Sequence, residues 1–388
     1  MRSFVSRRVA KVPPSAIRQF FDILHTMDDV ISLGIGEPDF CTPSHISQAG
    51  IRSLSNGGTS YSSNAGSLEL RELIADKLDE LYGIRYRAET EVLVTVGASE
   101  AISDFMTAAL DPGDEVIIPQ PCFVSYVPAV LFAGGTPVTI DTRLENDFAV
   151  TAEEIEARIT PRTKVLFLSY PSNPTGAVVS REEMLRIAEV ARRHDLLILS
   201  DEIYDRLVYG VEHVCVAALP GLRERTVHVG GFSKSYAMTG WRIGFVAGPE
   251  EILSAIAKVH QYVIMCAPTM AQHAAVQALR HGELDVQRMV RAYDRRRKLI
   301  VQGLNEIGLP TYEPRGAFYC FPRVSDLGMD DVTFAERLLV EEHVALVPGR
   351  AFGPTGQGHV RACYAAPVEE IEEALMRVRR FVERHAAD

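Results

Sequence analysis

The sequence lacks the residue patterns that usually bind metals in proteins. Its six cysteines are scattered, and none forms a Cys-x-x-Cys pair or lies near histidines that would complete a zinc site. The eleven histidines contain no His-Glu-x-x-His or similar helical pair. We therefore predict reduced thiols and no protein-bound metal, so any cofactor is expected to be organic.

An excess of positive charge is also missing. The 40 lysines and arginines are outnumbered by 51 aspartates and glutamates, which gives a formal net charge of -11. Such a chain is on average repelled by nucleic-acid backbones and anionic membranes. The basic N-terminal segment, broken by Pro13-Pro14, has no signal-peptide apolar run, and no apolar run elsewhere reaches membrane-spanning length. We expect a cytoplasmic protein with no nucleic-acid or membrane partner.

Apolar, β-rich runs do occur, and they alternate with amphipathic stretches between about residues 45 and 280. The runs are nearly continuous in apolar residues, as expected of strands covered on both faces. They are Val92–Val96, Glu115–Ile118, Lys164–Leu168, Leu196–Leu199, Thr226–Val229 and Ile243–Val246. This alternation predicts an α/β fold with a mainly parallel, doubly wound sheet in a large domain.

After Gly282 the pattern changes to that of a smaller α+β domain. We predict a charged helix over 283–307, strands at 317–321 and 360–364, a helix between them and a final helix from Val368. The predicted division is an N-terminal segment (1–44) that packs on the small domain and closes the site, a large domain (45–282) and a small domain (283–388).

Lys234 is the first candidate catalytic residue, because its amine can form an imine with an aldehyde cofactor. Ser233 and Arg242 flank it with a hydroxyl and a bidentate cation, both suited to a phosphate. A lone Ser-Lys pair at a strand end is more often a surface feature, so this interpretation depends on the residues around Lys234. Together these residues are half of a site for pyridoxal 5′-phosphate (PLP).

The other half must keep the pyridine nitrogen protonated, since the ring withdraws electrons from a substrate only as a cation. Asp201 follows a predicted central strand and supplies the carboxylate, while Tyr204 lies where a phenol could reach the cofactor's phenolate oxygen. The alternative is that Asp201 caps a following helix, the more usual role of Asp after a strand.

Three more candidates follow predicted strands. Asn173 could donate to the same phenolate oxygen, although Asn-Pro is commonly only a turn. Gly97-Ala98-Ser99 opens a helix whose backbone N–H groups can approach an anion. Phe123 could stack on a planar ring, although a lone aromatic is more often core. Ligands of doubly wound sheets bind beyond the carboxyl ends of the strands, so all these residues are expected to converge.

Seven stretches carry a resemblance to a known family: Ile31–Asp39, Tyr61–Gly66, Asn173–Gly176, Ser200–Tyr204, Gly231–Lys234, Met238–Arg242 and Gly316–Tyr319. In these the chain resembles the fold-type I, class I/II PLP-dependent aminotransferases, and most closely the branch with aromatic, aspartate and acetyl-diaminopimelate aminotransferases. The resemblance covers essentially the whole chain. It implies a homodimer with shared active sites.

The resemblance also implies a role for each candidate. Lys234 is the Schiff-base lysine and general base, Asp201 the partner of the pyridinium, and Tyr204 and Asn173 donors to the phenolate oxygen. The implied phosphate contacts are Ala98, Ser99, Ser233, Arg242 and, from the other subunit, Tyr61. Phe123 takes the stacking position. The implied substrate-binding residues are Gly36, Asn173 and Arg361, although a lone strand arginine otherwise suggests a surface ion pair.

The implied reaction is a ping-pong transfer of the amino group from an L-amino acid to a 2-oxo acid, with 2-oxoglutarate expected. Dicarboxylate enzymes of the family often recruit a second arginine from the segment matching 258–268, which contains none here. We therefore expect aromatic donors to be favoured, with an entrance lined by Ile17, Phe20, Tyr126 and the partner's Tyr262. The acceptor's second carboxylate is expected to be bound by hydroxyls, by water or by an arginine, for which Arg18 and Arg315 are the candidates.

Four alternatives stay open. The substrate could be aspartate or N-acetyl-diaminopimelate, and the same cofactor site could serve a PLP-dependent C–S lyase, because a fold does not fix a reaction. A non-catalytic PLP-binding regulator is the fourth. It requires a DNA-reading module, and we expect no basic helix-turn-helix to precede Met1 or to follow Asp388.

Overall fold

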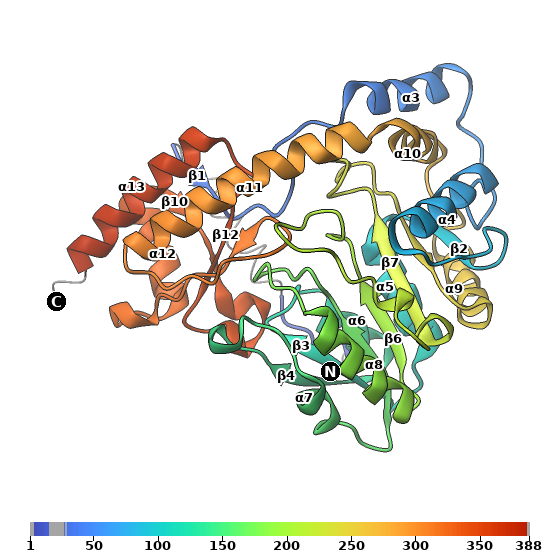
Figure 1. The fold of residues 1–388 in the computed structure, drawn as a ribbon, viewed down its shortest axis with the longest axis horizontal. Helices are drawn as coiled ribbons and strands as arrows, with labels where there is room; N and C mark the ends of the chain where they lie inside the picture. The colour runs from blue at the N-terminus through green and yellow to red at the C-terminus, as the bar shows by residue number, and fades with distance from the viewer. Residues whose placement is uncertain (1–3, 15–26, 28, 386–388) are drawn as a thin grey trace.

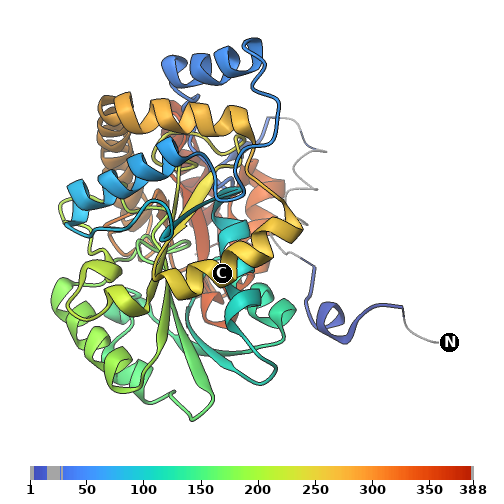
Figure 2. The same ribbon diagram turned by 90° about the vertical axis from the view of Figure 1, so that its right-hand side faces the viewer.

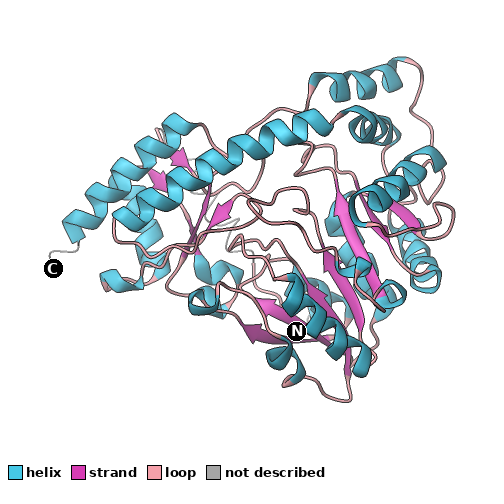
Figure 3. Cartoon of the chain, viewed as in Figure 1, coloured by secondary structure: helices cyan, strands magenta, loops and turns pink. Residues whose placement is uncertain are grey.

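The computed structural model describes residues 4–14, 27 and 29–385 and has a seven-stranded sheet at its centre (Figures 1 and 3). The strand order is β2-β8-β7-β6-β5-β3-β4, and β8 alone runs antiparallel to its neighbours. The strands are β2 (Val92–Thr95), β3 (Glu115–Gln120), β4 (Thr136–Asp141), β5 (Thr163–Leu168), β6 (Leu197–Asp201), β7 (Thr226–Gly231) and β8 (Gly244–Ala247). The fold is α/β with a mainly parallel sheet, as predicted.

Helices cover both faces of this sheet (Figure 2). Successive side chains of a strand point to opposite faces, so Val116 and Ile118 pack in one apolar cluster and Ile117 in another. The helices on the first face are α5 (Gly97–Ala109), α6 (Tyr126–Ala133) and α9 (Glu250–Val263). Those on the second face are α4 (Leu68–Tyr82), α7 (Ala152–Glu156), α8 (Arg181–Arg193) and α10 (Thr269–His281). Both layers are needed because the strands are apolar on each side.

The long helix α11 (Glu283–Glu306) runs from α10 to the C-terminal elements (Figure 1). There, α12 (Asp331–Glu342) and α13 (Val368–His385) pack near a small antiparallel sheet of β11 (Val347–Pro348), β12 (Val360–Cys363) and β9 (Tyr319–Cys320). β1 (Ile31–Ser32) pairs in parallel with β10 (Val344–Ala345). Two further helices are α1 (Arg7–Ala10) and α3 (Ser44–Ser55), and α3 packs on α10. The division into domains stays a prediction.

The six strands predicted in the large sheet are all present, with ends shifted by a few residues. The predicted elements at 283–307, 317–321, 360–364 and from Val368 are confirmed as α11, β9, β12 and α13. β4 was not predicted, because as an edge strand it is only partly buried and includes Pro137. Among the described residues, no helix combines the length and apolar character needed to cross a bilayer. The cytoplasmic location stays a prediction.

Candidate active site

A cavity of about 360 Å³ lies beyond the carboxyl ends of the central strands. Most of its lining residues follow a strand of the large sheet, and the others come from the 35–37 segment and from β9 and β12. The sequence-predicted residues that line it are Gly36, Ala98, Ser99, Phe123, Asn173, Asp201, Tyr204, Ser233, Lys234, Arg242 and Arg361. The structure therefore brings these residues together, whereas Gly97, Tyr61 and Arg315 are not among the residues that line the cavity.

Lys234 lies three residues past the end of β7 and points into the cavity. Its Nζ donates to the carbonyl oxygen of Gly36 at 2.7 Å and lies 5.8 Å from the centre of the Tyr204 ring. Burial, together with the nearby Arg361 and Arg242 guanidinium groups, lowers the pKa of Lys234 to about 8. Near neutral pH the uncharged form is therefore still the minority, but it is more populated than in an ordinary lysine, which favours a nucleophile or base.

Asp201 is the last residue of β6 and is 4% exposed. Burial raises the pKa of its carboxyl group, and hydrogen bonds from the Tyr126 hydroxyl and the Ile203 N–H oppose that rise. The Tyr126 hydroxyl donates to Asp201 Oδ2 at 2.7 Å, and Ile203 N donates to Oδ1 at 3.2 Å. Residues 203–206 form a turn. The interpretation of Asp201 as a helix cap is wrong, because no helix begins there.

The N-terminus of α5 forms one end of the cavity. Ala98 and Ser99 belong to its first turn, whose backbone N–H groups have no partner within the helix. Gly97 has φ +77°, and a Cβ atom there would lie 2.7 Å from Arg242 Nη2. Glycine therefore lets the guanidinium group lie against the helix end. Two positive features meet here beside Ser233, which is the donor chemistry that a phosphate needs.

Arg361 lies on β12 and is 3% exposed, so its interpretation as a surface ion-pairing residue is wrong. Its Nη1 donates to Asn173 Oδ1 at 2.9 Å and its Nη2 to the Gly34 carbonyl at 2.6 Å. Its buried Nε has no hydrogen-bond partner among the described residues. A buried guanidinium that is held by neutral oxygens and lines the cavity is suited to an incoming carboxylate.

A chain of hydrogen bonds joins these groups. The Tyr204 and Tyr319 hydroxyls lie 2.8 Å apart, and Tyr319 donates to the Gly36 carbonyl at 3.3 Å. A Cβ atom on Gly36 would approach the Tyr319 hydroxyl to 2.5 Å, so a larger residue would displace that ring. The Arg361 guanidinium carbon lies 4.5 Å from the centre of the same ring. Tyr319 thus connects the proposed cofactor side of the cavity to the substrate side.

The expectation that Tyr126 lines the entrance is wrong, and the expectations for Ile17 and Phe20 concern residues that the structure does not describe. Tyr126 was predicted at the entrance, but it is 3% exposed and bound to Asp201 at the inner end, because α6 begins there and turns its ring toward Phe167. Ile17 and Phe20 lie outside the described residues. Tyr61 is 81% exposed and does not line the cavity, so its role in a second subunit stays a prediction.

Sequence reasoning gave no role to six residues that line the cavity, which are Ile35, Glu37, Ile102, Ile203, Thr239 and Tyr319. Tyr319 belongs to the Gly316–Tyr319 stretch and could have been found there. Glu37 follows Gly36 and accepts a hydrogen bond from Thr239 Oγ1 at 3.0 Å. Glu37 belongs to the Ile31–Asp39 stretch and could have been found there in the same way.

The donor set therefore fits PLP: a lysine of lowered pKa, a buried carboxylate, phenol and amide donors, and a helix end beside an arginine. Comparison with known proteins gives the same answer. The sequence profile of "Aminotransferase class I and II" matches residues 28–378. The chain belongs to this family. Class I and II aminotransferases use PLP, and the chain is accordingly a PLP-dependent enzyme that transfers amino groups.

Three similar aminotransferases cover nearly the whole chain. The putative aminotransferase YugH of Bacillus subtilis is 50% identical over 99% of this chain and all of its own length. An aspartate aminotransferase of Pyrococcus abyssi is 47% identical over 97% of this chain and 98% of its own. A solved aromatic aminotransferase of Pyrococcus horikoshii is 46% identical, with a TM-score of 0.90 over 94% of this chain and 99% of its own. An aspartate and an aromatic enzyme are thus almost equally similar.

Proposed function

We propose that this aminotransferase moves the amino group of an aromatic L-amino acid to a 2-oxo acid, with 2-oxoglutarate as the acceptor, by a ping-pong mechanism. Bound PLP would supply the electron sink. Lys234 would hold the cofactor, and its freed Nζ would move the proton from the substrate Cα to C4′ of the cofactor. Asp201 would hold the ring nitrogen protonated, and Tyr204 and Asn173 would bind the phenolate oxygen.

The remaining roles follow the chemistry of the cavity. The first turn of α5, Ser233 and Arg242 would bind the phosphate, and Phe123 would stack on the ring. Arg361 and the backbone at Gly36 would bind the substrate α-carboxylate, since both line the cavity. The donor would leave as an oxo acid before the acceptor binds.

The charges in the cavity carry the proposed preference for aromatic donors. Among the described lining residues the cations are Lys234, Arg242 and Arg361, and each already has a proposed partner. Glu37 adds a carboxylate that would repel the side chain of aspartate. A charge-assisted hydrogen bond contributes about 1.5 to 3 kcal/mol, so its absence lowers specificity for aspartate roughly 10 to 150-fold.

The acceptor's second carboxylate still needs a donor. Arg18 lies outside the described residues, and Arg315 is not among the residues that line the cavity. We therefore test several 2-oxo acids as acceptors in the same experiment as the amino-acid donors.

Steady-state kinetics tests the preference. We expect kcat/KM for phenylalanine and tyrosine to exceed that for aspartate by about tenfold or more with 2-oxoglutarate as acceptor. N-acetyl-diaminopimelate is the third donor to measure, and phenylpyruvate and oxaloacetate are the control acceptors. An aspartate value about tenfold above both aromatics would contradict the proposal. Glu37→Gln should raise the aspartate value more than the phenylalanine value, because it removes the repelling charge.

We further propose a homodimer in which Tyr61 completes the partner's phosphate site. Tyr61 and Tyr262 are 81% and 87% exposed. Their segments are joined, since Asn64 Nδ2 donates to the Met265 carbonyl and Thr269 Oγ1 to the Ser60 carbonyl, each at 2.8 Å. Two large exposed aromatic rings on one connected surface are suited to burial against a second copy.

Mixed dimers test this proposal. Lys234→Ala subunits mixed with Tyr61→Phe subunits should regain activity, because one of the two sites then holds neither substitution. Refolding the mixture and measuring activity against each unmixed variant gives the comparison. Activity equal to the mean of the unmixed variants would show that each site is built from one chain.

A further inference from the structure

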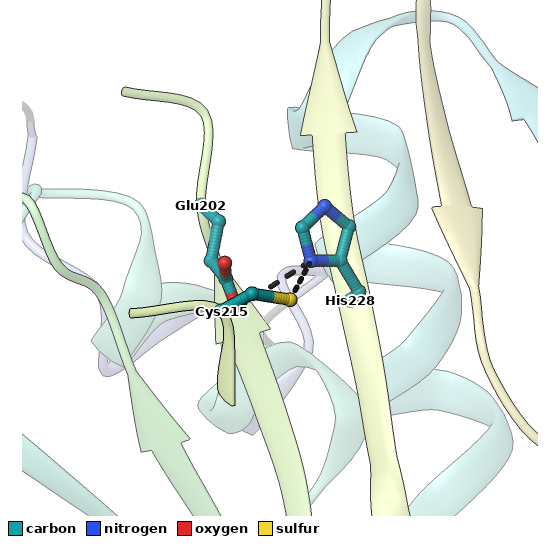
Figure 4. Close-up of side chains that lie close together, drawn as sticks. All are labelled: Glu202, Cys215 and His228. Atoms are coloured by element: carbon teal, nitrogen blue, oxygen red, sulfur yellow. Dashed lines mark hydrogen bonds and ion pairs between the residues drawn. The ribbon is translucent and has the colours of Figure 1, made fainter. Parts of the chain in front are cut away.

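A buried group of polar side chains lies behind Asp201, outside the cavity. It consists of Glu202, His213, Cys215 and His228. The Glu202 and His228 side chains are 0% and 1% exposed, and that of His213 is 7% exposed. Figure 4 shows Glu202 and Cys215 turned toward the imidazole of His228, which comes from the neighbouring strand β7. We call this group the Glu202 cluster.

Glu202 connects several segments through its carboxylate. Oε1 accepts from Ser200 Oγ at 2.8 Å and Val216 N at 3.1 Å, and it lies 3.4 Å from His228 Nδ1. Oε2 lies 2.5 Å from His213 Nε2. The backbone N–H of Glu202 also donates to the Val229 carbonyl at 2.9 Å. One carboxylate thus joins the end of β6, the strand β7 and both ends of the 213–216 segment.

The charges of the cluster balance one another. Burial acts to raise the pKa of Glu202, but the His228 and His213 imidazoles outweigh it and hold that pKa well below its usual range. Burial acts to lower the pKa of His228, but Glu202 and, more weakly, Asp205 and Asp201 outweigh it, so the pKa is raised. The groups that act on Asp201 itself are Tyr126 on α6, His228 on β7 and Glu202.

Position along the chain connects this cluster to the active site. Asp201 and Tyr204, which line the cavity, are the residues one before and two after Glu202. β6 ends at Asp201, and the turn at 203–206 has no ladder hydrogen bonds to hold it. The orientation of both side chains therefore depends on how firmly the chain is held at Glu202.

We propose that Glu202 and His228 are positioning residues for the aminotransferase reaction. Glu202 fixes the exit from β6, so that Asp201 meets the ring nitrogen and Tyr204 the phenolate oxygen, and His228 keeps a positive charge behind the Asp201 carboxylate. This inference rests on the proposed role of Asp201 and extends it to residues that touch neither substrate nor cofactor.

A cation site is the rival interpretation, because Glu, Cys and His are all zinc ligands. The hydrogen bonds of the cluster argue against a cation site. Glu202 Oε1 already accepts two hydrogen bonds and Oε2 faces His213, so a metal ion would compete with these partners for the carboxylate. Cys215 Sγ lies 3.9 Å from His228 Nδ1, and burial raises the pKa of this thiol well above its usual value, which opposes the thiolate that a metal would bind.

The test compares Glu202→Gln and His228→Gln with Glu342→Gln. Glu342 is a matched control: it is a buried carboxylate, 6% exposed, that pairs with Arg380 and Arg384 away from the cavity. Titration of each apoprotein with PLP gives the cofactor dissociation constant, melting without cofactor gives stability, and a pH titration of the visible band reports the charge around the bound ring.

For Glu202→Gln we expect PLP affinity and kcat to fall about tenfold or more with little change in KM, while Glu342→Gln changes PLP affinity less than about twofold. For His228→Gln we expect the pKa of the visible band, which reports the imine proton, to rise by about half a unit or more. Without the positive charge of His228, the Asp201 carboxylate is less stable as an anion and the ring nitrogen is less positive. The imine then holds its proton more tightly. His213→Gln, at the edge of the cluster, provides a milder variant in case the first two do not fold.

Each outcome decides the inference. The inference would be overturned if the cluster variants matched Glu342→Gln in PLP affinity, kcat and the pKa of the visible band. Stoichiometric zinc in the purified protein would also overturn it. If Asp201→Ala itself left PLP binding and turnover unchanged, the proposed function of Asp201 would fail instead. The two failures are therefore distinguishable.

Discussion

Lys234→Ala is expected to lower turnover by about 10⁴-fold or more and to remove the covalently bound cofactor. The expectation follows because one amine supplies both the covalent attachment and the base, and general base catalysis alone contributes about 10²- to 10⁴-fold. The purified wild-type protein should show a visible absorbance band, and borohydride reduction should fix a PLP mass on the peptide that contains Lys234.

Two comparisons make this experiment specific. Lys234→Arg keeps a cation in the cavity but cannot form an imine, so it should lose the visible band like Lys234→Ala. Lys164→Ala, which removes a half-exposed lysine paired with Asp114, should leave both band and turnover unchanged. PLP mass on any other peptide after reduction would refute the central assignment.

Asp201→Ala is expected to lower kcat by about 10³-fold or more and to weaken PLP binding, because preorganised charge partners contribute on that scale. In the wild type, burial raises the pKa of this carboxyl group, and a cationic ring nitrogen would be the charge that keeps it ionised. Asp201→Asn should behave similarly, since an amide of nearly the same shape cannot balance the ring's positive charge. Kinetics of the two variants measures the charge separately from the shape.

Asp205→Asn is the control for Asp201. Asp205 lies four residues later, accepts a hydrogen bond from the Tyr82 hydroxyl at 2.7 Å and does not line the cavity. Its replacement should lower the free energy of unfolding more than it lowers kcat. If Asp201→Ala stayed within about tenfold of wild-type turnover, this carboxylate would have only a structural role.

Much of the fold and site could be predicted because both depend on local pattern. Parallel strands place their carboxyl ends at one edge, so Asn173, Asp201 and Lys234 were expected to meet, and all three line the cavity. The six apolar runs that indicated buried strands are six of the seven strands of the central sheet. The antiparallel direction of β8 could not be predicted, since periodicity contains no information on direction.

The rest depends on which distant segments meet. Tyr126 was placed at the entrance because its sequence does not reveal the hydrogen bond to Asp201, 75 residues later. Tyr319 reaches Tyr204 across 115 residues, and the Glu202 cluster needs the 213–216 segment to fold back on β7. Side-chain chemistry indicates what each of these residues can do, but only the packing of the whole chain shows which partner it finds.

The pairing of β1 with β10 has a consequence for how the enzyme is made. Ile31 lies beside Val344, and the carbonyls that follow β1 accept hydrogen bonds from Lys234 and Arg361. Contacts between such distant residues form late, because closing a long loop costs entropy before the contact repays it. The cavity is therefore incomplete until Arg361 has left the ribosome. Tight cofactor binding should begin only near the end of synthesis.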